Sequence, residues 1–164
     1  MKKVDDLSPL EIKILLADDD RDDCDFFEQS LKELSIKAEL HIVHDGEELM
    51  KLLAEKKEIF HVLFLDLNMP RKNGFTCLKE IKHNPKLNNL PVIILSTSYD
   101  ARSINSVYEA GAQHYICKPS DFNQLKQLID KTLALTIPGK DDPVVTTQPA
   151  RKNFVINQSD PVLH

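Results

Sequence analysis

Short apolar runs alternate with amphipathic segments along most of this chain. Four of the runs are almost continuously apolar, as expected of strands that helices cover on both faces. The run 38–43 is more mixed, because it contains Glu39 and His41, and we expect it at an edge of the sheet. The predicted strands are Ile12–Ala17, Ala38–Val43, Val62–Leu65, Val92–Leu95 and His114–Cys117.

The segments that follow the runs repeat apolar residues at helical spacing, three or four positions apart. Glycine and proline occur in the joints between segments. Five strand–helix units in series predict an α/β fold, a doubly wound parallel sheet of five strands. Numbered along the chain, the strands are expected in the order 2-1-3-4-5, with two helices on one face and three on the other. The apolar positions are Cys24, Phe27, Leu31 and Leu34; Leu49, Leu52 and Leu53; Phe75, Leu78 and Ile81; Ile104, Val107 and Tyr108; and Phe122, Leu125, Leu128 and Ile129.

The pattern places one domain over residues 12–137, after an N-terminal extension of residues 1–11. Pro138-Gly139 then breaks the periodicity, and further prolines follow at positions 149 and 161. Residues 138–164 are therefore expected to form a tail without regular structure. Phe154-Val155-Ile156 is a small apolar cluster inside this tail, so a docking peptide is the alternative.

Composition narrows the class of protein. The formal net charge of the 164 residues is -5, which argues against a dedicated nucleic-acid binder. No stretch has the length of a membrane span, and the first residues lack the apolar core of a signal peptide. The three cysteines form neither a CxxC pair nor a zinc spacing, so we expect buried free thiols and a cytoplasmic location. They are Cys24, Cys77 and Cys117.

Polar residues that could bind a ligand or take part in a reaction follow four of the predicted strands. Carboxyl ends of parallel strands meet at one edge of the sheet, which is where ligands bind in this fold class. Asp20 is well placed to cap the following helix, which leaves two carboxylates beside Asp66. Carboxylates this close repel one another unless a cation lies between them, and Mg²⁺ prefers such oxygen ligands. The residues that end the strands are Asp18-Asp19, Asp66, Ser96 and Lys118.

This set of groups suits phosphoryl transfer to a carboxylate. Asp66 would be the nucleophile, as in proteins that form aspartyl phosphates. Ser96 and Lys118 would hold phosphoryl oxygens, because such a transition state needs mainly positioning and charge neutralisation.

Over about residues 12–135 the chain resembles the receiver domains of bacterial two-component response regulators. The resemblance implies a flavodoxin-like receiver fold, a signalling role rather than a metabolic enzyme, and a sensor histidine kinase or histidine phosphotransfer protein as phosphoryl donor. The motifs that carry it are Leu16-Ala17-Asp18-Asp19-Asp20, Phe64-Leu65-Asp66-Leu67-Asn68-Met69-Pro70, Asn73-Gly74, Pro91-Val92-Ile93-Ile94-Leu95-Ser96-Thr97, Ala110-Gly111-Ala112 and Tyr115-Ile116-Cys117-Lys118-Pro119. Two runs of the chain are similar to single-domain receivers that partner phytochrome-type and other sensor kinases: Asp18-Asp19-Asp20-Arg21-Asp22-Asp23 and Asn68-Met69-Pro70-Arg71-Lys72-Asn73-Gly74.

The resemblance also implies a role for each site residue. Asp66 is the phosphoacceptor and Lys118 the phosphate-binding lysine. Ser96 and Tyr115 are the switch pair, in which the aromatic ring turns inward on activation. The Mg²⁺ ligands are Asp18, Asp19, Asp66 and the backbone carbonyl of Asn68.

Two further expectations come from the same resemblance. The Lys118–Pro119 peptide bond is expected to be cis. The face made by the fourth helix, fifth strand and fifth helix is expected to form a homodimer or meet a target when Asp66 is phosphorylated. Arg21, where the family often has proline, and Cys117 depart from the usual pattern.

Three other functions fit the sequence less well. A haloacid-dehalogenase-type phosphatase needs a second Asp where this chain has Asn68. A flavodoxin-like cofactor binder needs a phosphate loop where this chain has three acidic residues. A pseudo-receiver, which only binds partners, should have lost Asp66 or Lys118, and both are present.

Overall fold

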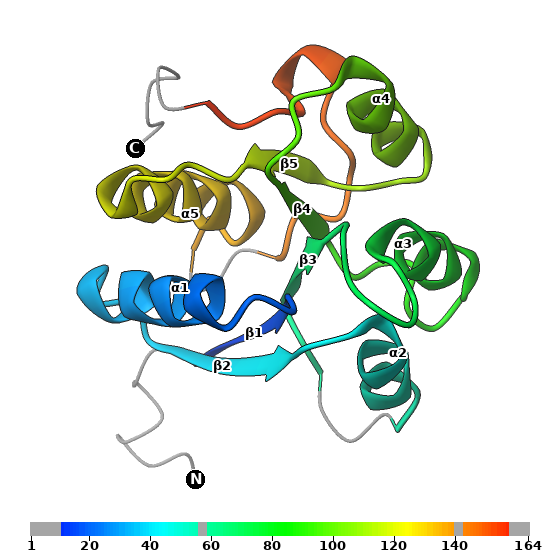
Figure 1. Cartoon of the computed structure of the whole chain (residues 1–164), viewed down its shortest axis with the longest axis horizontal. Coiled ribbons are helices and arrows are strands. Elements are labelled where there is room, and N and C mark those ends of the chain that lie inside the picture. The colour runs from blue at the N-terminus through cyan, green and yellow to red at the C-terminus, as the bar shows by residue number, and fades with distance from the viewer. Residues whose placement is uncertain (1–10, 56–58, 140–142, 158–164) are drawn as a thin grey trace, which may run out of the picture.

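The computed structural model describes residues 11–55, 59–139 and 143–157 (Figure 1). All but Glu11 of the expected N-terminal extension lies outside these residues. The strands are β1 (Ile12–Ala17), β2 (Ala38–Val43), β3 (Val62–Asp66), β4 (Val92–Ser96) and β5 (His114–Cys117). The helices are α1 (Arg21–Glu33), α2 (Gly46–Glu55), α3 (Gly74–His83), α4 (Ala101–Glu109), α5 (Phe122–Thr136) and the short 3-10 helix η2 (Arg151–Asn153).

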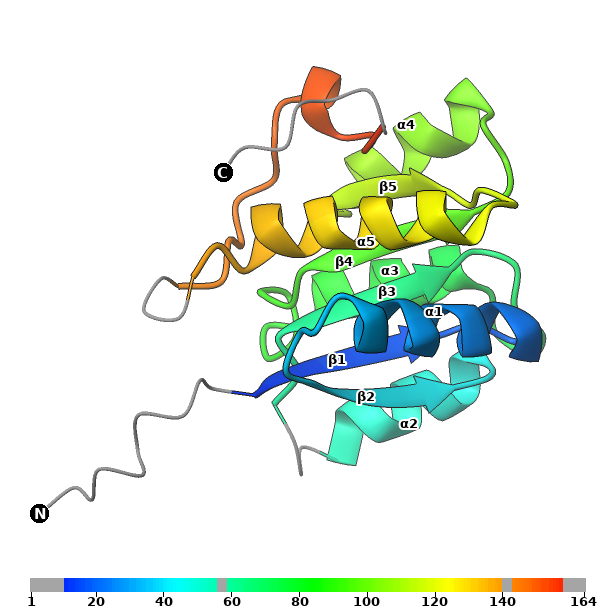
Figure 2. The same cartoon turned by 90° about the vertical axis from the view of Figure 1, so that its left-hand side faces the viewer.

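The five strands form one parallel sheet in the order β2-β1-β3-β4-β5, which confirms the predicted topology. Helices α1 and α5 cover one face, and α2, α3 and α4 cover the other (Figures 1 and 2). The predicted strands are also confirmed, except that β3 and β4 each run one residue further, to Asp66 and Ser96. Two of the expected site residues are therefore the last residues of central strands.

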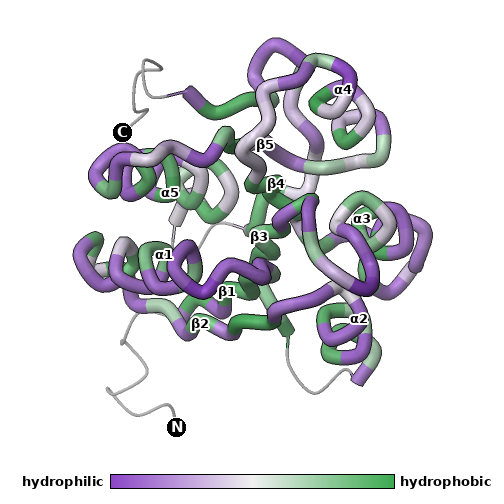
Figure 3. Tube along the Cα trace, in the orientation of Figure 1, coloured by the Kyte–Doolittle hydropathy of each residue, from purple (hydrophilic) through white to green (hydrophobic). Residues whose placement is uncertain are grey.

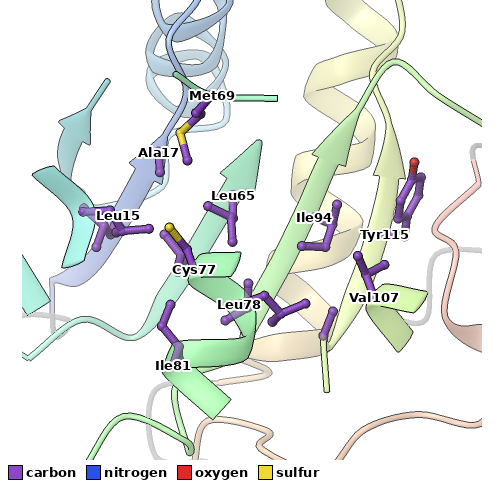
Figure 4. Close-up of a cluster of buried hydrophobic side chains, with 14 of the residues drawn as sticks. Leu15, Ala17, Leu65, Met69, Cys77, Leu78, Ile81, Ile94, Val107 and Tyr115 are labelled. Carbon is purple, nitrogen blue, oxygen red and sulfur yellow. The ribbon is translucent and has the colours of Figure 1, made fainter. Parts of the chain in front are cut away.

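Alternate residues of the strands enter two separate cores. In β1, Ile14 and Leu16 face α1 and α5, where Phe27 meets Phe64 edge to face with ring centroids 4.9 Å apart. Leu15 and Ala17 face the other core, beneath α2, α3 and α4 (Figure 4). The central strands are hydrophobic over most of their length, whereas the helices alternate along theirs (Figure 3). Burial of both sheet faces fixes the register, since a slip of one residue would exchange the two sets.

Residues 143–150 have no helix or strand, as expected of the tail, but residues 151–155 depart from that expectation. Helix α5 ends at Thr136, close to the predicted boundary, but the chain then returns to the sheet. It forms η2, and Val155 pairs with Tyr115 of β5 as in a parallel sheet. The tail is ordered because Phe154 and Ile156 are buried, and burial of apolar side chains offsets the entropy lost in fixing the segment.

Gly74 shows how closely α3 packs on the end of β3. A Cβ atom at this position would overlap the backbone carbonyl of Asp66. The Gly74 amide also donates to the Leu67 carbonyl at 3.0 Å, and Asn73 caps the helix by accepting from the Thr76 amide at 2.9 Å. The Asn-Gly pair thus lets the helix begin directly beside Asp66.

We expect Gly74→Ala to lower the free energy of unfolding by about 1–3 kcal/mol, because the backbone after β3 must move. Urea unfolding would measure the loss. Thr76→Ala, an exposed change in the same helix, is the control and should stay within about 0.5 kcal/mol of wild type. Equal stability of the two variants would show that this contact is not tight.

Candidate functional site

The polar residues predicted from the strand ends meet at the carboxyl edge of the sheet. Asp18 follows β1, Asp66 ends β3, Ser96 ends β4 and Lys118 follows β5. The side chains of Asp18, Asp66 and Ser96 are buried. Asp20 is the N-cap of α1 and accepts from the amides of Asp22 and Asp23, as predicted. Asp18 and Asp19 are thereby left for other partners.

Three carboxylates form a group that could hold a metal ion. Asp18, Asp19 and Asp66 each offer an oxygen atom, and these atoms lie within 4.8 Å of one another. Asp19 is exposed, so the group opens to solvent on its side. A cluster of carboxylate oxygens is the donor set that hard divalent cations such as Mg²⁺ prefer, so the residues fit the predicted ion.

Lys118 brings the positive charge to this group. Its Nζ atom lies 2.8 Å from Asp18 Oδ2, 3.0 Å from Asp23 Oδ2 and 3.7 Å from Asp66 Oδ2. Burial opposes the charged form, but the hydrogen bond and charge of Asp18, together with Asp66 and Asp23, outweigh it and raise the pKa of Lys118. The ammonium group is therefore permanently charged at neutral pH.

The expected cis bond before Pro119 is wrong, since no peptide bond in the described residues is cis. The lysine reaches the carboxylates without it. Its backbone amide donates to the Ser96 carbonyl at 2.8 Å, which continues the pairing of β4 and β5 beyond Cys117. From this anchored backbone, the flexible four-carbon stem of lysine is long enough to turn Nζ into the site.

Asp23 is a partner of Lys118 that the sequence reasoning missed. It lies in the first turn of α1, on a different element from the strand ends that guided the prediction. The acidic run that contains Asp18 and Asp19 also contains Asp23, and this crowding was the available signal. Asp23 neutralises part of the positive charge of Lys118 that would otherwise act on Asp66.

Asp66 is electrostatically unusual. Its burial raises the pKa to about 7, the charge of Asp18 acts in the same direction, and Lys118 acts against both. The Asn68 amide donates to Asp66 Oδ1 at 3.2 Å and also favours the ionised form. The predicted rise of a carboxylate pKa in this group is confirmed, although burial contributes more to it than repulsion does.

Ser96 and Tyr115, the expected switch pair, both make hydrogen bonds to the backbone of Ser98. Ser96 Oγ accepts from the Ser98 amide at 3.1 Å, and Tyr115 donates its hydroxyl to the Ser98 carbonyl at 2.6 Å. The Tyr115 ring is fully buried and lies over the core residue Val107 (Figure 4). In this structure the ring is therefore already turned inward.

The cysteines have mixed environments. Cys24 lies beside the site, with Sγ 3.5 Å from the Asp18 carbonyl, and burial raises the pKa of its thiol to about 12. Burial likewise raises the pKa of Cys77, to about 11. Cys117 is only partly buried, so the expectation of three buried thiols is wrong for this residue.

The comparisons with known proteins agree with the geometry. Residues 14–130 match the family model of the response regulator receiver domain. The response regulator Rcp1 of Synechocystis sp. is 32% identical over 130 residues, which cover 76% of this chain and 88% of Rcp1. Three other curated relatives are longer, and the chain spans 16% to 27% of their length.

Solved structures give the same result. The phosphorylated cyanobacterial phytochrome response regulator RcpA has a TM-score of 0.72 at 30% identity, and the match covers 77% of this chain and 94% of RcpA. The Mn²⁺-bound form of Rcp1 has a TM-score of 0.71 at 30% identity, covering 85% of this chain and 99% of Rcp1. None of the helices in the described part of the chain has the length and apolar composition needed to cross a membrane.

The raised pKa of Asp66 predicts how stability depends on pH without divalent cations. The folded chain keeps the Asp66 proton up to about pH 7, whereas an unfolded aspartate loses it near pH ~4. The folded state therefore binds more protons in this window, and its stability falls as pH rises through it. Above the window, Asp66→Asn should be more stable than wild type by on the order of 2 kcal/mol.

Urea unfolding in the presence of a chelator, from pH ~4 to pH ~8, would test this. Asp25→Asn is the matched control, because Asp25 is exposed and lies outside the carboxylate group. It should follow the wild-type curve. If wild type and Asp66→Asn keep a constant difference across the window, Asp66 is not the group that retains the proton.

Proposed function

Because the chain belongs to the family of response regulator receiver domains, we propose that it accepts a phosphoryl group on Asp66. The donor is the phosphohistidine of a sensor histidine kinase or of a histidine phosphotransfer protein. The observation that carries the proposal is the position of Asp66 at the end of β3, beside the Asp18–Asp19 pair and 3.7 Å from the Lys118 ammonium group. The stand-alone receivers that it resembles are signalling proteins rather than metabolic enzymes.

The transfer is a displacement at phosphorus. A carboxylate oxygen of ionised Asp66 forms the new O–P bond while the N–P bond of the donor breaks, and the electron pair leaves with the imidazole. The three non-bridging oxygens keep their negative charge throughout, so the site must neutralise charge and hold the group in line. Lys118 supplies a permanent positive charge 3.7 Å from Asp66, and the Ser96 hydroxyl supplies a donor at the end of the neighbouring strand.

Mg²⁺ is the cation that we propose for the carboxylate group. Asp18, Asp19 and Asp66 would hold it together with the backbone carbonyl of Asn68. When bound, the ion supplies positive charge beside the acceptor oxygen, which favours ionised Asp66 and a transferring phosphoryl group. The Mn²⁺-bound form of Rcp1, a structural neighbour, supports a divalent cation in this kind of site.

Lys118 has to redistribute its contacts for this role. In this structure it is closer to Asp18 and Asp23 than to Asp66. A phosphoryl group on Asp66 adds negative oxygens on that side, which favours movement of the ammonium group toward them. A cation beside Asp18 would weaken the pairing of Lys118 with that carboxylate in the same way.

The relatives support a class of partner. RcpA is described as a phytochrome response regulator, and this supports a phytochrome-type sensor kinase in the cytoplasm as the donor. Rearrangement of Ser96 and Tyr115 is the proposed route by which phosphorylation changes the outer surface. Association of two copies through the α4–β5–α5 face stays a prediction. The residues expected on that face include Phe122, whose ring in fact lies beside α1, with its centroid 6.4 Å from that of Phe26.

We expect acetyl phosphate with Mg²⁺ to add one phosphoryl group to the intact protein, in a linkage that is stable to acid and labile to base. Intact-mass spectrometry would detect it. Asp66→Asn should remain unmodified, because its amide cannot act as the nucleophile, whereas Asp25→Asn should be modified as wild type is. Modification of Asp66→Asn at the wild-type rate would place the acceptor elsewhere.

The metal site predicts a specific loss of affinity. Asp19→Asn removes one anionic oxygen ligand and should weaken Mg²⁺ binding by at least about tenfold, equivalent to ~1.4 kcal/mol. Titration followed by amide chemical shifts of Asp66 and Asn68 would measure it, again with Asp25→Asn as control. Equal Mg²⁺ affinity of Asp19→Asn and wild type would exclude Asp19 as a ligand.

A further inference from the structure

Strand β5 forms an outer strand of the five-stranded sheet, and residues 154–156 add to its outer side. The Tyr115 amide donates to the Phe154 carbonyl at 3.1 Å, and the Ile156 amide donates to the Tyr115 carbonyl at 2.9 Å. Val155 therefore pairs with Tyr115 in parallel. Figures 1 and 2 show this last part of the described chain leaving η2, near α4, and running past the outer side of β5. The contact has the hydrogen-bond pattern by which extended peptides add to an exposed sheet edge.

The two apolar side chains of this short strand enter different cores. Phe154 is fully buried with the residues beneath α2, α3 and α4, and its ring meets Tyr108 edge to face at 5.0 Å. Ile156 is buried with the residues beneath α1 and α5. Each such burial contributes about 1.5–3 kcal/mol, so the two pockets hold the segment firmly.

Hydrogen bonds from side-chain amides and a hydroxyl hold residues 145–149, which precede this strand. The Gln148 amide donates to the carbonyls of Tyr108 and Ala112, both at 2.7 Å. Gln113 donates to the carbonyls of Val145 and Thr147, at 3.3 and 2.7 Å, and the Tyr108 hydroxyl donates to the Pro149 carbonyl at 2.9 Å. Most of these bonds are made to the backbone of an extended segment, so they recognise its shape rather than its side chains.

Arginine adds a further contact at η2. Arg151 Nε donates to Asn105 Oδ1 of α4 at 2.8 Å, and its guanidinium carbon lies 5.9 Å from the Tyr108 ring centre and 5.8 Å from that of Phe154. The recognised segment thus consists of an arginine, an aromatic residue three positions later and an aliphatic residue two positions after that. Specificity lies in Arg151, Phe154 and Ile156, and the polar contacts set the direction of the chain.

We infer that the outer side of β5, together with α4, is a binding surface for an extended segment of this kind, and that residues 143–157 occupy it within the same molecule. A partner or a second copy can reach this surface only by displacing them. Covalent attachment gives the segment an effective concentration on the order of millimolar, so a separate peptide of the same sequence cannot compete at micromolar concentration.

A labelled peptide of residues 143–157 tests the inference with the full chain. It should not bind wild type at micromolar concentration, whereas it should bind the double variant Phe154→Ala/Ile156→Ala, whose own segment fits the two pockets poorly. Phe75→Ala, which truncates an exposed phenylalanine of α3, is the matched control and should behave as wild type. Equal binding of the peptide to wild type and to the double variant overturns the inference.

Hydrogen exchange gives a second readout that does not depend on a core substitution. In wild type the Tyr115 and Ile156 amides should exchange at least about a hundredfold more slowly than in an unstructured chain. Gln148→Ala, which removes only two polar contacts, should speed exchange at Ile156 more than at Ile94 in the sheet centre. Unprotected Tyr115 and Ile156 amides in wild type overturn the inference. Loss of protection on dilution, in parallel with loss of a dimer detected by sedimentation, also overturns it, because the segment would then bind a second copy.

One consequence rests on the proposed function, because Tyr115 is both the proposed switch residue and the residue that pairs with the segment. Saturation with beryllofluoride, a mimic of the phosphoryl group, should change exchange at Ile156 by about tenfold or more. Shifts at Asn68 report beryllofluoride binding independently. Binding without a change at Ile156 overturns this coupling, whereas absence of binding overturns the proposed function and leaves the occupied surface as inferred.

Discussion

The ammonium group of Lys118 is the one basic group, within the described residues, at ion-pair distance from Asp18 and Asp66. Three carboxylates share its charge, since Asp23 is also bound, and Asp19 adds a further negative charge at the same edge. One positive charge cannot balance four negative ones. Burial of Asp66, together with the remaining imbalance, explains the proton that Asp66 tends to keep. The imbalance also explains the affinity for a divalent cation that the site should have.

The rest of the fold holds these like charges close together. The free energy that this costs is offset by packing in the two cores. The sheet is buried on both faces, so its strand ends cannot shift without disturbing two cores. Lys118 is fixed through its backbone bond to Ser96, at the junction of β4 and β5. Strand β5 is in turn fixed from its outer side by residues 154–156. The position of the ammonium group therefore depends on contacts on both sides of β5.

Local pattern was enough to predict the sheet and most of the site. The strands are continuous apolar runs between breakers, and their carboxyl ends had to meet at one edge, which brought Asp18, Asp66, Ser96 and Lys118 together. Asp20 could be assigned as a cap because capping depends on neighbouring residues only.

The features that escaped prediction depend on contacts between distant parts of the chain. The bond between Asp23 and Lys118 joins residues 95 positions apart, and no periodicity reports it. The segment 143–157 has little pattern of its own, and it is ordered by pockets for Phe154 and Ile156 that exist only once the sheet has formed. The cis bond was expected from the family alone, and the reach of the lysine stem makes it unnecessary here.

The pairing of Val155 with Tyr115 also affects the tendency of the protein to aggregate. An uncovered strand at the rim of a sheet is a template on which other chains can add, and proteins avoid this with charges or with a covering segment. Strand β2, at the opposite rim, carries Glu39 and His41, which bond to each other at 2.7 Å. Strand β5 is mostly buried and apolar, and it has residues 154–156 as its cover instead. Proteolytic cleavage before Phe154 would therefore expose β5 as an apolar edge strand. The protein would then aggregate for a reason that is independent of its role in signalling.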